Sequence, residues 1–227
     1  MAEYFVSASD AGVLSRFRKE KDVVADLVIK TLDSETAISV TAEAPFRFGS
    51  VWSFPEAGSP AEFELYASVI TSDDPKWVAC VVGLFENTTN YLFGLSYAGV
   101  HGLLAELVDN VRTNLLYPRF ILDQQIKKSE IRVRVSGLGT AKALKLKVWQ
   151  GAEPSAWSAE GNYDQNNSSG LVGISIPAID QGIFSYGIGT NGDTAPTSPV
   201  ATGPDTPINP SITSLLATSA RLNWEQG

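Results

Sequence analysis

Two residue types that commonly act as catalytic base or nucleophile occur once each in this sequence, as the imidazole of His101 and the thiol of Cys80. Nucleophilic catalysis needs the base held beside the nucleophile. His101 precedes Gly102 at the expected start of a strand, where a turn or rim position is the favoured interpretation. Cys80 lies within an apolar run, so we expect a small, buried packing residue. The sequence therefore predicts no catalytic residue.

A pair of carboxylates offers a different chemistry. Glu62 and Glu64 are two residues apart, which places both on one face of a strand. Paired carboxylates can hydrolyse a glycosidic bond. We favour a solvent-exposed face instead, because Ala61 and Phe63 follow simple alternation and no second motif supports catalysis. The chain is accordingly predicted to be no enzyme, with a glycan-active hydrolase as the alternative.

Oxygen-bearing side chains cluster between Asn162 and Asn167, and Asp193 is an isolated candidate of the same kind. A calcium site needs several oxygen ligands that converge from a loop. A plain polar loop is the favoured interpretation. The Gly137-Leu138-Gly139 turn joins two expected strands, which is the wrong context for a phosphate loop. Neither a metal nor another cofactor is predicted.

Aromatic residues offer a sugar-stacking surface. Trp149 shares parity with Lys145 and Lys147, so strict alternation points its ring outward, beside Trp157 and Tyr163. A sugar ring could stack on such a platform. The interpretation that we favour is a bulge at Trp149 that turns the ring inward and gives it a structural role. If a glycan binds, the predicted site comprises Trp157, Tyr163, Asp164, Asn166 and Asn167.

The elements that must position these residues are strands, because the apolar period is two along most of the chain. Residues 63–69, 131–135 and 144–148 alternate, and the arginines and lysines of the last two segments are expected to face outward. Residues 77–85 and 91–97 are apolar on both parities, which is typical of central strands covered on both sides. Two tryptophans are expected in the core, Trp52 and Trp77.

Helical signals are weak, with a turn or two within residues 11–21 and an ambiguous stretch at residues 115–127. Clusters of Gly, Asn, Asp, Ser and Pro separate the strand-like runs at short spacing. Many short strands with frequent turns favour a sandwich or barrel. The prediction is an all-β, antiparallel β-sandwich.

Composition removes several classes of partner. The chain has 227 residues, with 17 Lys and Arg against 25 Asp and Glu, a formal net charge of −8. That balance argues against nucleic acid and against anionic lipid as partners. The lone cysteine excludes an internal disulfide. No secretion signal and no run of about 18 apolar residues are present, so membrane insertion is not expected.

The composition changes after Gly192. Residues 193–210 contain five prolines among Thr, Ser, Ala and Gly, which is typical of a semi-rigid linker. The segment 211–227 carries apolar side chains with too little chain to bury them. We therefore predict that it docks on a neighbouring subunit through Ile212, Leu215, Leu222 and Trp224. The alternatives are that it packs back on the rest of its own chain or is the start of a longer domain.

The segment 144–157 reads LKLKVWQGAEPSAW. It resembles a recurring signature of concanavalin-like, laminin-G-like jelly-roll domains in bacteriophage virion proteins. Those domains have a strand that ends in Lys-Val-Trp, a Gly-containing turn, Glu-Pro and a second Trp. A Gly-x-x-Gly strand at 170–176 and a closing strand that runs to Ala195-Pro196 extend the likeness. The resemblance is specific over residues 131–196. Before Lys128 only the general pattern of strands is similar, and the stretch 110–127 is longer than the family suggests.

The tail from Pro210 to Glu225 is similar to the first two strands of a fibronectin type III domain, in which the second strand carries a core Trp. The resemblances imply a jelly roll over residues 1–192, a linker over 193–210 and a partial fibronectin-like segment over 211–227. A two-stranded piece of this kind is marginal by itself.

The resulting hypothesis is a non-enzymatic virion structural protein, either a capsid decoration or a tail or fibre component. Its expected partners are other virion subunits, copies of itself in a homo-oligomer, and host-surface glycans. It would be made in the host cytoplasm and displayed on the virion surface. A free carbohydrate-binding module with the same fold is a further alternative.

Overall fold

The protein is described here by a computed structural model that covers most of the chain. The described residues are 2–20, 25–43, 51–70, 79–87, 90–97, 101–109, 111–118, 128–137, 139, 141–164, 169–199, 211–216 and 219–223.

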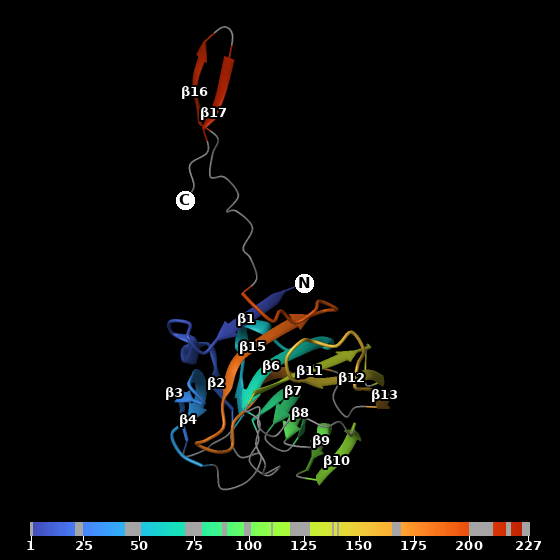
Figure 1. The fold of residues 1–227 in the computed structure, drawn as a ribbon. Helices are drawn as coiled ribbons and strands as arrows, with labels where there is room; N and C mark the ends of the chain where they lie inside the picture. Colours follow the sequence, from blue (N-terminus) through green and yellow to red (C-terminus); the bar gives the residue numbers. More distant parts are fainter. Residues whose placement is uncertain are drawn as a thin grey trace.

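The described residues form two large antiparallel sheets and a short hairpin (Figure 1). Sheet A has the strand order β13-β12-β11-β6-β15-β4-β3, and β1 also pairs with β15. Its strands are β1 (Glu3–Ser7), β3 (Leu27–Leu32), β4 (Glu35–Val40), β6 (Phe63–Ile70), β11 (Lys128–Ser136), β12 (Ala141–Trp149), β13 (Ala159–Asp164) and β15 (Ile183–Thr190).

Sheet B has the order β10-β9-β8-β7-β14-β5-β2. It consists of β2 (Arg18–Lys19), β5 (Val51–Ser53), β7 (Cys80–Asn87), β8 (Asn90–Tyr97), β9 (His101–Val108), β10 (Val111–Leu116) and β14 (Leu171–Ser175). The hairpin is β16 (Ser211–Leu216) with β17 (Ser219–Asn223). Two short 3-10 turns, η1 (Val13–Arg16) and η2 (Pro55–Ala57), are the helical elements of the described part. Neither is long enough to cross a bilayer.

The expected antiparallel β-sandwich is therefore confirmed. Its main core lies between the sheets and is built from one parity of each strand, such as Leu65, Val133 and Leu146 from sheet A and Val81 and Leu104 from sheet B. Trp52 is buried in this core, as predicted. Trp77 lies outside the described residues.

The central strands of sheet B are apolar on their other face too. A second cluster there includes Val82 of β7, Phe93 of β8 and Leu103 of β9, all buried. This confirms the expectation that runs apolar on both parities are covered on both sides. Cys80 belongs to this cluster and is buried, as expected of a packing residue.

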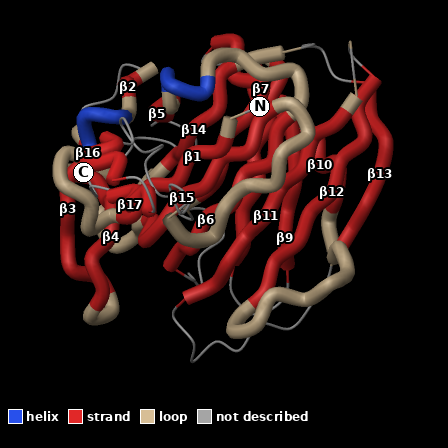
Figure 2. The backbone as a smooth tube through the Cα atoms, turned by 90° about the horizontal axis from the view of Figure 1, so that it is seen from above, coloured by secondary structure: helices blue, strands red, loops and turns tan. Residues whose placement is uncertain are grey.

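The outer face of sheet A carries charged side chains, yet it is covered. Arg132 and Lys147 point away from the core, but each is only 5% exposed. The loop of residues 150–158 and the segment Asp193–Pro196, here called the C-terminal strap, contact these side chains from outside. In Figure 2, which looks down on this side of the molecule, loops run across the strands. The predicted direction of the charged side chains was right, and their predicted exposure was wrong for these two.

Glu64 is the centre of this covered charge cluster. One carboxylate oxygen accepts from Arg132 Nη1 and the other from Arg134 Nε. The backbone N–H of Ala195 in the strap donates to Glu64 Oε1 at 3.1 Å, and Arg132 Nη1 donates to the Ala195 carbonyl at 2.8 Å. The expectation of a solvent-exposed Glu64 was wrong, because the strap lies directly over it and leaves it 1% exposed.

The loop of residues 150–158 completes the cluster. Glu153 accepts from Arg132 Nη2 and from Lys147 Nζ, both at 3.0 Å. Partial burial acts to raise the pKa of Glu153, but these two hydrogen bonds prevail and the pKa is lowered. Lys147 Nζ also donates to the Pro154 carbonyl at 2.7 Å. The loop is thereby held down on sheet A.

Glycine permits the close approach of the strap. A Cβ on Gly187 would lie 2.0 Å from the Pro196 carbonyl oxygen, and one on Gly189 would lie 2.4 Å from that of Asp193. Any larger residue at either position of β15 would push the strap off the sheet. Residues 193–196 therefore pack on the sandwich. The first four residues of the predicted linker 193–210 thus belong to the folded domain.

Trp149 follows the alternation without a bulge, because the pairing of β11 with β12 runs without a register shift through Glu130 and Trp149. Its ring lies 6.1 Å from that of Tyr66 on the outer face and is buried beside Ala195 of the strap. The predicted inward bulge was wrong. The structural role expected of Trp149 is consistent with this burial, which the covering segments bring about.

The Glu64 cluster gives a first prediction. Glu64→Gln keeps the side-chain volume but leaves two arginines facing a neutral group, so the free energy of unfolding should fall by about 3–5 kcal/mol. The matched control is Glu160→Gln, which breaks the exposed pair with Lys145 and should cost less than about 1 kcal/mol. Urea denaturation followed by far-ultraviolet circular dichroism measures both, and equal losses would contradict the central role of Glu64.

Candidate functional site

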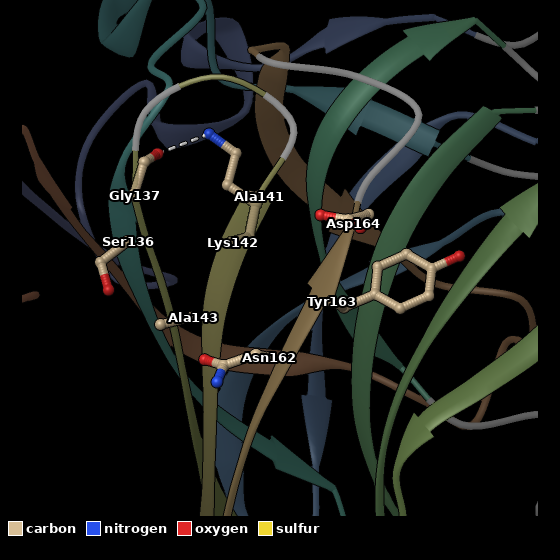
Figure 3. Close-up of a pocket in the computed structure, with 8 residues that line it drawn as sticks. All are labelled: Ser136, Gly137, Ala141, Lys142, Ala143, Asn162, Tyr163 and Asp164. Atoms are coloured by element: carbon tan, nitrogen blue, oxygen red, sulfur yellow. Dashed lines mark hydrogen bonds between the residues drawn. The ribbon is translucent and has the colours of Figure 1, made fainter.

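A hollow of about 440 Å³ opens on the outer face of sheet A, at the ends of β11, β12 and β13 (Figure 3). We call it the first hollow. Ser136, Ala143 and Asn162 lie side by side across these three strands, because Ala143 pairs with both of the others. Ala141 pairs with Asp164 one step further. The two alanine side chains on the central strand are shorter than their neighbours on β11 and β13, and this leaves the depression.

Three polar side chains at the first hollow have no hydrogen-bond partner in the described part of the chain. Ser136, Asn162 and Asp164 make no side-chain hydrogen bond to any part of the chain that the structure describes. Asn162 and Asp164 are exposed, whereas Ser136 is half-buried. Together they present a hydroxyl, an amide and a carboxylate on three neighbouring paired strands.

Lys142 has a different role at this hollow. Its ammonium donates to the carbonyl of Gly137 at 2.8 Å (Figure 3). It also donates to the carbonyl of Ala61 at 2.8 Å and so ties the turn between β11 and β12 to the segment just before β6. Burial lowers its pKa, against the opposing effect of nearby Glu62. Glu62 holds the same turn by accepting from the Gly137 N–H at 2.6 Å. The rim is therefore structurally fixed.

A second, smaller hollow of about 160 Å³ adjoins the first. The two share Ser136. The second hollow is otherwise lined by Glu62, Phe63, Arg134, Val135, Lys145, Gly192 and Asp193. The carboxylate of Asp193 has no ion-pair or hydrogen-bond partner among the described residues.

Trp157 lies over the cations next to the second hollow. Its ring centre is 4.9 Å from Lys147 Nζ, 5.6 Å from the Arg134 guanidinium carbon and 6.0 Å from Lys145 Nζ. Such contacts hold the ring in place. Trp157 thus forms a half-buried wall beside Arg134 and Lys145.

Tyr163 points the other way. Along β13 the side chains alternate, so Asn162 and Asp164 face the first hollow while the ring of Tyr163 faces sheet B (Figure 3). Its hydroxyl donates to the Glu106 carboxylate on β9. Burial, followed by this hydrogen bond, raises the pKa of Tyr163 to about 12. The residue joins the two sheets at their β13 and β10 edges.

The structure thus brings together part of the predicted glycan site. Asp164 and Tyr163 are both among the residues that line the first hollow, although the ring of Tyr163 extends toward sheet B, and Trp157 stands beside the second hollow. Asn166 and Asn167 lie outside the described residues. Sequence reasoning considered Asn162, Asp193 and Glu62 for other chemistry and missed Ser136 and Ala143, whose importance depends on which strands are neighbours.

The docking residues expected in the tail are only partly placed. Ile212 of β16 pairs with Leu222 of β17, and Leu215 pairs with Ala220. Trp224 lies outside the described residues. Subunit docking through this segment stays a prediction.

The structure bears on the catalytic and metal alternatives as well. Glu64 is buried with both oxygens engaged, so the Glu62–Glu64 pair does not present two accessible carboxylates. His101 begins β9, a strand start as expected. Within the described ranges, no group of three or more His, Cys, Asp or Glu side chains could hold a metal ion.

Comparisons with known proteins find similarity of fold. A scan against protein-family models and a search of curated proteins give no match. Among solved structures, the carbohydrate-binding module CBM66 from Bacillus subtilis aligns over 74% of this chain and 92% of its own, at 9% identity and a TM-score of 0.46. Lectin I-B4 from Griffonia simplicifolia aligns over 84% and 100%, at 12% identity and 0.47.

A third structure is the CBM2 module of the evolved Dit of Lactobacillus casei BL23 phage J-1. It aligns over 84% of this chain and 96% of its own, at 10% identity and a TM-score of 0.44. Because all three TM-scores lie below 0.5, the likenesses carry no inference about the ligand of this chain.

The Tyr163–Glu106 contact predicts a pH dependence. The raised pKa of Tyr163 stabilises the fold fully below pH 10, the ordinary value, and that contribution is lost as the pH rises through about 12. The difference in unfolding free energy between the natural protein and Tyr163→Phe should therefore shrink between these two pH values. Urea titrations across this range measure it.

Glu106→Gln in the presence of Tyr163 is the control, because it removes the carboxylate that Tyr163 faces and should reduce the same pH-dependent step. A difference between the natural protein and Tyr163→Phe that stays constant through the range would contradict the assignment.

Proposed function

We propose that this chain is a non-enzymatic, carbohydrate-binding structural protein of a bacteriophage virion, either a capsid decoration or a tail or fibre component. The observation that carries the binding role is the first hollow, where Ser136, Asn162 and Asp164 present polar groups without a partner among the described residues, around a floor of small alanines. Host-surface glycans are the ligand class that this chemistry suits.

The polar character of the first hollow favours a sugar. A hydroxyl, an amide and a carboxylate can together donate to and accept from the many hydroxyl groups of a sugar. The volume of about 440 Å³ falls within the range of roughly 300–1,000 Å³ that is usual for ligand pockets. All three groups stand on paired strands, so binding needs little ordering of the protein.

The burial of the candidate nucleophile and of one candidate acid supports a purely binding role. Cys80 is buried in the apolar cluster on sheet B, away from either hollow. Both carboxylate oxygens of Glu64 accept hydrogen bonds from its two arginines and the strap. The hydrolase alternative would therefore need a different pair of carboxylates from the one that the sequence suggested.

The virion role rests on the sequence resemblance over residues 131–196. The Glu-Pro pair of that signature is Glu153-Pro154, which holds the loop over sheet A. The Ala-Pro pair is Ala195-Pro196, which forms the strap. The residues that carry the resemblance are thus the ones that cover the outer face of the sandwich. Display on the virion surface and assembly with capsid or tail subunits are part of this proposal.

Filling the first hollow should abolish glycan binding. Ala143→Phe places a large ring over the floor without entering the core, since Ala143 is on the outer face, and Asn162→Ala with Asp164→Ala removes two of the polar groups. Both variants should lose the signals that the natural protein gives on a glycan array and keep its thermal unfolding temperature.

The matched control is Thr113→Phe, the same kind of change on exposed strand β10, which should bind as the natural protein does. Array binding that survives Ala143→Phe would place the ligand elsewhere, and a natural protein that binds no glycan would refute the binding role itself.

Deleting residues 198–227 tests the attachment role of the tail. The strap remains, so the sandwich should stay folded and soluble while the truncated protein no longer enters particles. A second truncation that removes residues 193–227 serves as the structural control, because it also takes away the Ala195 groups that hold Glu64 and Arg132 and should lower the unfolding temperature. Normal incorporation of the shorter deletion would assign attachment to the sandwich surface.

A further inference from the structure

The two hollows adjoin each other at Ser136, which lines both. Both lie on the outer face of sheet A. The pair Ser136–Ala143 is followed along β11 and β12 by the pair Arg134–Lys145, which lines the second hollow. Outward-facing residues of one strand are about 7 Å apart. The two hollows together are therefore longer than a single sugar unit.

The cations of the second hollow are already used by the protein. Arg134 Nε donates to Glu64, and its Nη2 donates to Thr194 Oγ1 at 3.2 Å. Lys145 Nζ pairs with Glu160 Oε2 at 2.7 Å. Both cations also contact the ring of Trp157. Each of these cations thus already faces a carboxylate of the protein.

The carboxylates that line the two hollows have fewer partners within the protein than these cations do. Asp164 in the first hollow and Asp193 in the second have no side-chain partner among the residues described, and Glu62 uses one oxygen for the Gly137 N–H. The free hydrogen-bonding capacity is thus mainly that of negatively charged acceptors. Such groups accept from hydroxyls and amines, and they repel anions.

We infer that the ligand is an oligosaccharide of two or more neutral or amine-bearing sugars that spans both hollows across Ser136, and that glycans rich in uronate, sulfate or phosphate are excluded. This inference rests on the proposed glycan binding and adds to it the length and the charge of the ligand. Asp164 contacts one sugar unit, Asp193 contacts a neighbouring unit, and Ser136 lies between them.

The experiment uses the full chain and an array of neutral, amino-sugar and uronate oligosaccharides, each present from single sugars to hexamers. Binding should appear with neutral or amino-sugar dimers and longer chains. It should be at least about tenfold weaker for the single sugars, because they lose the charged hydrogen bond at Asp193. Uronate oligomers should give no signal.

Asp193→Asn is the deciding variant, because it keeps the shape of the side chain and removes its charge. It should reduce the affinity for the bound oligomers by about tenfold, as titration calorimetry with the strongest array ligand measures, while binding of single sugars at high concentration stays the same. Asp180→Asn, at an exposed carboxylate outside both hollows, is the matched control and should change neither.

The outcomes separate this inference from the proposed function. Binding that is lost in Ala143→Phe but unchanged in Asp193→Asn would keep the glycan-binding role and overturn the two-hollow ligand. Uronate oligomers that bind as well as neutral ones would likewise overturn the inference alone. An array with no bound glycan, or binding unaffected by Ala143→Phe, would overturn the proposed function and this inference with it.

Discussion

The buried carboxylate of Glu64 is the interaction on which the outer half of this molecule depends. It sits between Arg132 and Arg134 of the neighbouring strand and accepts from the strap at Ala195. A carboxylate with 1% exposure is costly to bury unless its hydrogen bonds are complete. The strap supplies a further hydrogen bond to Glu64, and the loop of residues 150–158 supplies partners to Arg132 and Lys147 beside it, so the sheet and its cover stabilise each other. The sandwich is thus closed by apolar packing between its sheets and by charge pairing on the outside of one of them.

The candidate site exists because this cover is incomplete. The covering segments bury Lys147, Arg132 and Trp149 toward one end of β11 and β12. At the other end the outward residues are Ser136, Ala141 and Ala143, which offer nothing large enough to fill the surface. Two outward polar side chains of β13, Asn162 and Asp164, then have no hydrogen-bond partner within the described part. The same sheet face is therefore a structural support at one end and an open, hydrogen-bonding surface at the other.

Much of the fold could be predicted from the sequence. The period of two identified the strands and assigned their inward faces, and doubly apolar runs marked the strands of sheet B that are buried on both sides. The burial of Cys80 and Trp52 followed from the same patterns. The candidate site could be predicted less well. The residue types pointed to Asp164, Tyr163 and Trp157, which line or adjoin the hollows, whereas the alanine floor was missed because it depends on which strands are neighbours.

The physical reason lies in what a local pattern contains. Alternation along one strand determines which side chains share a face, so the sequence by itself determined that Arg132, Lys147 and Trp149 point away from the core. It holds no information about which segment later covers that face, and only the tertiary structure decided that Glu64 and Trp149 are buried by the strap. The lateral order of strands is equally absent from a local pattern. Ser136, Ala143 and Asn162 became one site only when β11, β12 and β13 paired in this register, because hydrogen bonding between strands, and no property of the single strands, sets which residues are neighbours.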